Sequence, residues 1–306
     1  MHVKIILCGL MLGVLASAGT AQTTLPIWPP GKMPNDNGVP VTDSIARDRI
    51  WQVARPELTV WPAPPETNTG AAVLVLLGGG YARQATLTLA GEVVDWFNSL
   101  GVNVFLLKYR LPQAPNVVVS YQAPIQDAQR AMRLIRSRAA EWGVDPSRIG
   151  AMGFSAGGHL AATLGTHQTD YAAPCDALDT LPFQPDFLIL ISPVITMGRQ
   201  THQGSRQNLL GENPAPELAE AFSLEHQVTD QTPPAFLVHA ADDPAVPPAN
   251  SLEFARALTD HGVSASLHLF PFGQHSIGLK NNPGSTASWT LICAQWLREM
   301  GFTEKK

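Results

Sequence analysis

The hydrophobic positions from residue 72 onward fall into short, continuous apolar segments separated by longer amphipathic segments. Apolar runs of about 4–8 residues are typical of strands that are buried on both faces of a parallel sheet. The pattern predicts strands over residues 72–77, 102–109, 149–154, 187–192, 235–240 and 264–270. Because helices are expected between most of these strands, the alternation indicates the α/β class, with helices on both faces of a mostly parallel central sheet.

The amphipathic segments predict helices near residues 89–100, 125–142, 157–165, 249–261 and 285–300. The clearest is the segment 125–142, in which apolar residues such as Ile125 and Ala128 recur every three or four positions. Gly143 and the following Asp145-Pro146 supply the stop signal that ends this helix.

Two parts of the chain depart from this alternation. Residues 22–45 begin with a stretch rich in Pro, Gly and Asn and are expected to form an irregular arm. Residues 50–53 and 58–61 follow as short candidate strands, which we expect to pair antiparallel at a sheet edge because prolines surround them. Residues 193–234 contain Gly-, Asn- and Pro-rich pieces around a short candidate helix at 216–222, and they are the candidate roof of a binding site.

Composition limits the class of protein. The 306 residues are 45% hydrophobic and 15% charged, with a formal net charge of −5, which is typical of a globular chain with a large core. Since α/β folds of about 200–250 residues routinely form one unit, and no repeat or low-complexity linker divides the chain, we expect a single domain over residues 22–306. The lack of a basic run argues against a nucleic-acid partner.

The N-terminus has the pattern of a secretory signal peptide over residues 1–21. Lys4 precedes the apolar run Ile5–Leu15, and small residues follow up to Ala21. The run is shorter than the roughly 20 residues that a membrane-spanning helix needs, so we expect cleavage after Ala18 or Ala21 and a secreted or periplasmic protein without a membrane partner.

Cleavage would leave two cysteines, Cys175 and Cys293. In an oxidising compartment they could form a disulfide, or they could remain as two free thiols. Neither belongs to a CxxC pair, so the cysteine spacing does not indicate a zinc site.

The candidate nucleophile is Ser155, which lies in a G-x-S-x-G pattern with Gly153 and Gly157. The pattern is weak alone, but here a predicted strand runs into the serine and a helix of small residues follows it. Such a strand–turn–helix elbow strains the serine backbone and exposes Oγ at the edge of the sheet. We therefore expect nucleophilic catalysis by Ser155.

A serine hydroxyl needs a base, and the base needs a carboxylate that orients it. His275 follows the strand predicted at 264–270, and Asp242 and Asp243 follow the strand predicted at 235–240. Asp243 is the preferred acid because it begins D-x-x-V-P, whereas Asp242 is more typical of a turn. The order Ser, Asp, His is that of α/β-hydrolases.

Four other histidines are less suited to be the base. His159 lies one helical turn beyond Ser155 and is expected to pack or to form a buried hydrogen bond, and His268 and His261 lie inside a strand and at a helix end. His239 precedes the acid loop, where it either orients that loop or is simply buried.

The oxyanion of a tetrahedral intermediate is usually held by backbone N–H groups. Three consecutive glycines directly follow the strand at 72–77, where one half of such a site is expected. We assign Gly79, Gly80 and Ala156 as the donors, and Tyr81 as a substrate-binding residue.

These motifs resemble the α/β-hydrolase superfamily, and they are closest to secreted carbohydrate acetyl esterases of the acetylxylan esterase-like type. The resemblance runs from about residue 50 to the C-terminus and includes Pro193–Met197 and Asn208–Gly211. Two positions depart from it: Leu77 replaces the histidine of the HGGG pattern, and Gln274 replaces a glycine common before the catalytic histidine.

The resemblance implies an α/β-hydrolase fold and a serine esterase that removes short acyl groups, acetyl above all, from carbohydrate or small-molecule esters through an acyl-enzyme. A general carboxylesterase, a peptidase related to prolyl oligopeptidases and a non-catalytic binding module are the alternatives. The sequence contains no HExxH, no phosphate-binding loop and no dinucleotide fingerprint, so no metal or organic cofactor is expected.

Overall fold

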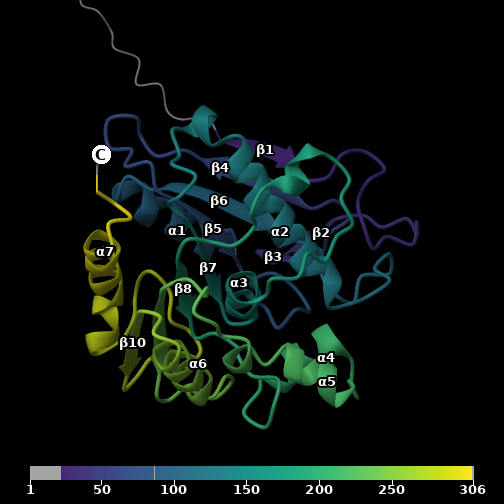
Figure 1. The fold of residues 1–306 in the computed structure, drawn as a ribbon. Helices are drawn as coiled ribbons and strands as arrows, with labels where there is room; N and C mark the ends of the chain where they lie inside the picture. Colours follow the sequence, from purple (N-terminus) through teal and green to yellow (C-terminus); the bar gives the residue numbers. More distant parts are fainter. Residues whose placement is uncertain (1–21, 86, 305–306) are drawn as a thin grey trace, which may run out of the picture.

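The computed structural model describes residues 22–85 and 87–304. Through this part of the chain runs an eight-stranded sheet with the order β1-β4-β6-β5-β7-β8-β9-β10 (Figure 1). Its strands are β1 (Thr23–Pro26), β4 (Glu57–Trp61), β5 (Ala72–Leu76), β6 (Asn103–Lys108), β7 (Ile149–Phe154), β8 (Leu188–Ile191), β9 (Ala235–Ala240) and β10 (Ala265–Phe270). All pairs from β6 to β10 are parallel, and β4 is antiparallel to β1 and β6, which confirms the mostly parallel sheet.

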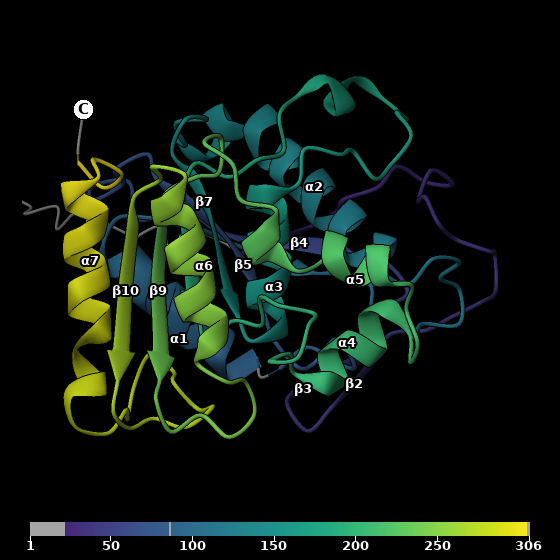
Figure 2. The same cartoon turned by 60° about the horizontal axis from the view of Figure 1, so that its bottom comes forward.

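The helices are α1 (Leu87–Ser99), α2 (Gln122–Ser137), α3 (Ala156–Thr166), α4 (Gln203–Leu210), α5 (Pro216–Ala221), α6 (Ala249–Asp260) and α7 (Trp289–Glu299). In Figure 2, α6 and α7 lie beside β9 and β10, while α4 and α5 form a separate group on the other side of the molecule. Short 3-10 helices cover Ala139–Trp142, Ala177–Thr180, Leu224–His226 and Gly284–Ser288.

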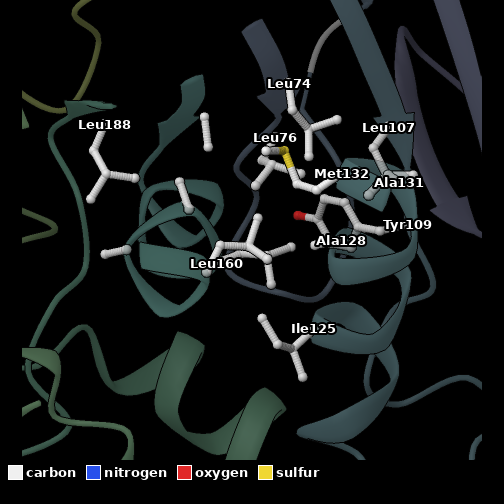
Figure 3. Packing of buried hydrophobic residues seen from close by; sticks show 14 of the residues in the cluster. Leu74, Leu76, Leu107, Tyr109, Ile125, Ala128, Ala131, Met132, Leu160 and Leu188 are labelled. Atoms are coloured by element: carbon white, nitrogen blue, oxygen red, sulfur yellow. The ribbon is translucent and has the colours of Figure 1, made fainter. Parts of the chain in front are cut away.

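Both faces of the central strands β5 to β9 are buried, as their continuous apolar runs predict, whereas the edge strand β10 is only half-buried, contrary to expectation. On β5, Leu74 and Leu76 pack into one core with α2, α3 and α6, whereas Val73 and Val75 pack into a second core with α1 and α7. Figure 3 shows the first core, in which Met132 of α2 lies near Leu76. Helices therefore cover both faces of the sheet.

The buried side of α2 is the one expected from its apolar periodicity, but two of its arginines are also buried. Arg130 pairs with Asp176 and Asp179, and Arg133 pairs with Asp170. The segment 170–181 therefore covers this part of the helix with compensating charge.

The N-terminal expectations need correction. Residues 22–45 are not wholly irregular, because β1 lies in them and pairs with β4, and β2 (Ser44–Ala46) pairs with β3 (Arg49–Gln52). The two candidate strands around 50–53 and 58–61 do not pair with each other, since β4 is enclosed between β1 and β6. The expected signal peptide lies outside the described residues.

Two further features bear on earlier expectations. Cys175 and Cys293 are both free thiols, the second fully buried beside α1 and the sheet, so the disulfide alternative is wrong for this structure. In the part of the chain that the structure describes, no helix has both the length and the apolar character needed to cross a bilayer.

Candidate active site

The predicted catalytic residues lie at the carboxyl ends of the parallel strands β7, β9 and β10. From β5 the chain moves to β6 on one side and then to β7 on the other, so β5 and β7 flank a topological switch point. In open α/β sheets, ligands bind in the crevice at such a point. Gly79 follows β5 and Ser155 follows β7, which places both at this crevice.

Ser155 occupies the strained turn expected of a nucleophile elbow. Its φ of 54° and ψ of −121° lie outside the regions that side-chain-bearing residues favour, and it directly precedes the first residue of α3. The glycines on either side are required: a Cβ at Gly153 would lie 2.1 Å from the carbonyl oxygen of Gly157, and a Cβ at Gly157 would lie 2.1 Å from that of Leu76. Close packing of α3 onto the sheet thus fixes the serine at the strand end.

The structure joins Ser155, His275 and Asp243 in one chain of hydrogen bonds. His275 Nε2 lies 2.8 Å from Ser155 Oγ, and its Nδ1 lies 2.7 Å from Asp243 Oδ2. A carboxylate can only accept a hydrogen bond, so Nδ1 donates to Asp243. In the neutral ring, Nε2 is then unprotonated and can accept the serine proton. The loops that carry the two residues leave the same edge of the sheet because β9 and β10 pair in parallel.

The Asp243 carboxylate is held in its ionised form. Its side chain is fully buried, which alone would raise its pKa, but hydrogen bonds from His239, His275 and the N–H of Val246 lower the pKa well below the usual range. His239 Nε2 also donates to the carbonyl oxygen of Val246 at 3.0 Å and lies 3.3 Å from Asp243 Oδ2. His239 therefore contacts the acid directly, which sequence reasoning had left open.

The three assigned oxyanion donors also converge on this crevice. Gly79 and Gly80 have φ values of 134° and 65°, and both line the same cavity as Ser155. Ala156 begins α3, so its N–H has no partner within the helix. None of these three N–H groups donates a hydrogen bond to another described residue. Asn208 Nδ2 donates to the carbonyl oxygen of Gly80 at 2.8 Å, which fixes the glycine loop against α4.

Tyr81 does not lie where a substrate-binding residue is expected. It is 1% exposed and does not line the cavity, and its hydroxyl donates to His159 Nδ1 at 2.9 Å. Nδ1 of His159 carries no proton and accepts this bond, because Nε2 of the same ring donates to the carbonyl oxygen of Phe222. The assignment of Tyr81 is therefore corrected: its φ of 60° turns the ring into the core. His159 forms a buried hydrogen bond, as expected.

Backbone strain gathers around the site. Tyr81, Ser155, Ser192 and Gln274 are non-glycine residues with φ values of 60°, 54°, 43° and 49°. Each directly follows a strand end or a glycine at the carboxyl edge of the sheet. Strained residues persist where the surrounding packing fixes them, and they cluster at functional sites. Among these residues, Gln274 has the left-handed backbone conformation that usually favours glycine.

A cavity of about 990 Å³ opens above Ser155 and His275. Its size is at the upper end of the range of about 300–1,000 Å³ typical of ligand sites. Phe154, Ile191 and Ile277 form apolar walls near the serine, whereas Asp48, Arg49, Arg83 and Glu92 supply charged groups elsewhere in the lining. The roof is shared: the segment 193–234 supplies only α4 and its entry, and other lining residues include Asp48, Arg49, Ala82, Arg83, Ala85, Thr88, Leu89 and Glu92.

Sequence reasoning missed one polar residue of this roof, His202. It directly precedes α4 and lines the cavity. Burial and the nearby His275 lower its pKa, so the ring is neutral near pH 7. No motif marks it, because α4 is a short polar helix without the apolar periodicity that identifies the others.

Comparisons with known proteins find a matching family and several similar proteins. Residues 60–258 match the family model described as BD-FAE. Among curated proteins, an endo-1,4-beta-xylanase B of Butyrivibrio fibrisolvens is 37% identical over 210 residues, which cover 69% of this chain and 33% of that protein. An acetylxylan esterase of Xylanibacter ruminicola is 31% identical over 242 residues, which cover 78% of this chain and 46% of that protein. The chain thus spans less than half the length of these two relatives.

A solved structure covers nearly all of the chain. It is the acetyl ester-xyloside bifunctional hydrolase from Caldicellulosiruptor lactoaceticus, with a TM-score of 0.74 and 36% sequence identity, and the match covers 92% of this chain and 97% of that one.

Proposed function

Since the chain belongs to the BD-FAE family and has the α/β-hydrolase fold, we propose that it is a serine esterase that removes acetyl and other short acyl groups from carbohydrate esters. The observation that carries this proposal is the hydrogen-bonded chain from Ser155 through His275 to Asp243, which faces a cavity lined by the glycine loop. The acetylxylan esterase and the acetyl ester hydrolase among the similar proteins support the acyl group and the class of alcohol.

The reaction follows from the hydrogen-bond directions at the site. His275 Nε2 takes the proton of Ser155 Oγ as that oxygen bonds to the ester carbonyl carbon. The buried Asp243 carboxylate stabilises the imidazolium that forms, and N–H groups of Gly79, Gly80 and Ala156 hold the oxyanion. The imidazolium then gives its proton to the departing sugar oxygen as the carbon–oxygen bond breaks.

The second half of the reaction reverses these roles on water. His275 takes a proton from a water molecule, whose oxygen attacks the carbonyl carbon of the acyl-enzyme. Collapse of the intermediate breaks the bond to Ser155 Oγ, which recovers its proton from His275 and releases the acid. All proton transfers therefore pass through one nitrogen, Nε2.

A panel of aryl esters from acetyl to octanoyl, together with acetylated xylo-oligosaccharides, tests the acyl and alcohol preferences. Each buried methylene contributes about 0.8 kcal/mol in an apolar tunnel, so a lipase should improve steadily with chain length. We expect kcat/KM to fall beyond butyryl and acetate to be released from the sugar esters. A tenfold preference for octanoyl without any sugar deacetylation would replace this proposal with a general carboxylesterase or lipase.

We also propose that the protein is exported to the periplasm or the medium. The support is the charged and apolar pattern of residues 1–21 and the small residues at their end. Fractionation of expressing cells and N-terminal sequencing of the exported protein should show a mature chain that begins at Gly19 or Gln22. An intact N-terminus in the cytoplasmic fraction would contradict export.

A further inference from the structure

The ring of His202 is held in one place by the entry to α4. Its Nδ1 lies 3.2 Å from the backbone nitrogen of Ser205 and 2.8 Å from the Oγ of the same residue. A Cβ built on Gly204 would lie 3.2 Å from His202 Cε1, and one built on Gly80 would lie 3.6 Å from it. The imidazole therefore packs between two residues without side chains, one of them in the oxyanion loop.

The hydrogen bond at Nδ1 decides which nitrogen carries the proton. A backbone N–H can only donate, so Nδ1 accepts from Ser205, and in the neutral ring the proton is on Nε2. Nε2 makes no hydrogen bond to any residue among those described, although His202 lines the cavity. An N–H donor is thus available to whatever occupies the cavity.

The roof helix that carries this donor is fixed to the rest of the site. Asn208 at the other end of α4 donates to Gly80, Gln113 Nε2 donates to the carbonyl oxygen of Asn208, and Ser120 Oγ donates to that of Leu209. A donor on a fixed element is pre-organised and loses little freedom when it binds a ligand.

We propose that His202 is a substrate-binding residue whose Nε2–H donates a hydrogen bond to a hydroxyl or ring oxygen of the sugar that carries the ester. This inference rests on the proposed function and adds the group that recognises the alcohol. The acetyl methyl offers no acceptor, and the ester carbonyl oxygen already faces the backbone donors of Gly79, Gly80 and Ala156. The acceptor that matches a further donor beside Gly80 is therefore on the alcohol.

The donor also makes the site selective. An alcohol without an acceptor at this position leaves a partly buried N–H group unpaired, and sites built to hydrogen-bond a substrate discriminate against analogues that lack the matching group. An aryl acetate can react without using His202, whereas an acetylated xylo-oligosaccharide should depend on it.

Two substitutions separate the donor from the helix cap. His202→Asn keeps a side chain that caps helices well but is too short to replace Nε2 in the cavity. His202→Gln can place an amide N–H near the position of Nε2 but is a poorer cap. Loss of a cap costs about 0.5–2 kcal/mol, so both variants should fold, and thermal unfolding verifies this.

The experiment compares kcat/KM for 4-nitrophenyl acetate and for acetylated xylo-oligosaccharides in the wild-type protein and both variants. We expect His202→Asn to lose about tenfold on the sugar ester and less than about twofold on the aryl ester, and His202→Gln to recover most of the sugar activity. The loss should appear mainly in KM, since the contact is made in the bound substrate as well as in the transition state.

Other results would overturn the inference. Equal losses on both esters would place His202 at the ester group, and unchanged activity on both would show that it contacts no substrate. If wild-type protein hydrolyses aryl acetate but no acetylated sugar, the carbohydrate part of the proposed function fails, and this inference fails with it. If the sugar ester is hydrolysed and His202→Asn has no effect, this inference alone fails.

Discussion

The carboxylate of Asp242 accepts a hydrogen bond from the backbone N–H of Gln274 at 2.7 Å. This contact joins the loop that follows β9 to the loop that follows β10, one residue away from Asp243 on one side and from His275 on the other. The two adjacent aspartates thus have separate tasks: Asp243 binds the imidazole, and Asp242 holds the left-handed Gln274 backbone that presents it.

Asp243→Asn should lower kcat far more than Asp242→Asn. An amide at position 243 no longer balances the imidazolium and can stabilise the wrong ring tautomer, which costs about 10⁴-fold in a comparable triad. An amide at position 242 keeps an oxygen that accepts from Gln274, so we expect a loss of less than about tenfold. Steady-state kinetics with an aryl acetate give kcat for both variants. A larger loss of kcat from Asp242→Asn would show that Asp242, and not Asp243, is the acid.

Gly79→Ala should abolish most turnover. A Cβ on Gly79 would lie 2.3 Å from the carbonyl oxygen of Arg83, and the φ of 134° is strained for any other residue, so the oxyanion loop must move. Loss of one oxyanion donor costs about 10²–10³-fold in kcat.

Gly91→Ala is the matched control for this substitution. A Cβ on Gly91, within α1, meets nothing within 4 Å, and alanine should stabilise the helix by up to about 1 kcal/mol. Similar kcat values for the two variants would contradict the role assigned to the loop.

Acid should destabilise the fold partly through His159. Burial lowers its pKa to about 4 from the ordinary 6.5, so the unfolded chain binds a proton between these pH values while the native imidazole does not. Stability therefore falls as pH drops from 6.5 to 4, by on the order of 3 kcal/mol from this group.

His159→Gln should flatten this pH dependence. Glutamine can still donate to Phe222 and accept from Tyr81, but it does not titrate. Urea unfolding at pH 7 and pH 4.5 should show a smaller stability loss for the variant than for wild type. Burial lowers the pKa of His167 and His268 in the same way, so part of the dependence should remain. An unchanged loss in the variant would rule out the proposed effect of His159.

Turnover should not change when divalent metal is removed with a chelator, because the proposed reaction uses only Ser155, His275, Asp243 and backbone donors. Among residues 22–85 and 87–304, one cluster of possible metal ligands consists of Cys175, Asp176 and Asp179. Arg130 already pairs with both aspartates. Loss of activity with a chelator, restored by a divalent metal, would contradict this.

Much of the sheet could be predicted because its central strands, β5 to β9, are buried on both faces. For β7 and β9 the expected and observed bounds agree. The site could be predicted as well: Ser155, Asp243 and His275 follow parallel strands, and the carboxyl ends of parallel strands lie at one edge of the sheet.

Features that depend on tertiary contacts could not be predicted from the sequence. β1 reads as an irregular segment because Thr23–Pro26 has no buried pattern, and its strand conformation comes from pairing with β4. The α4 helix depends on hydrogen bonds to distant residues such as Gln113, and Tyr81 turns inward through a backbone angle that the side-chain type does not indicate. Because the sequence does not predict α4, it also does not identify His202, which directly precedes that helix, as a site residue.

The most direct test of the account is acetate release from an acetylated xylo-oligosaccharide by wild-type protein and by Ser155→Ala, with Ser137→Ala as an exposed control serine at the end of α2. Removal of the nucleophile should leave only the background from binding and the oxyanion donors, a loss of at least about 10³-fold, with an unchanged melting temperature. Wild-type activity on the sugar ester that depends on Ser155 and not on Ser137 is the predicted result. Release by Ser155→Ala at more than about a tenth of the wild-type rate would show that the acyl group is transferred elsewhere.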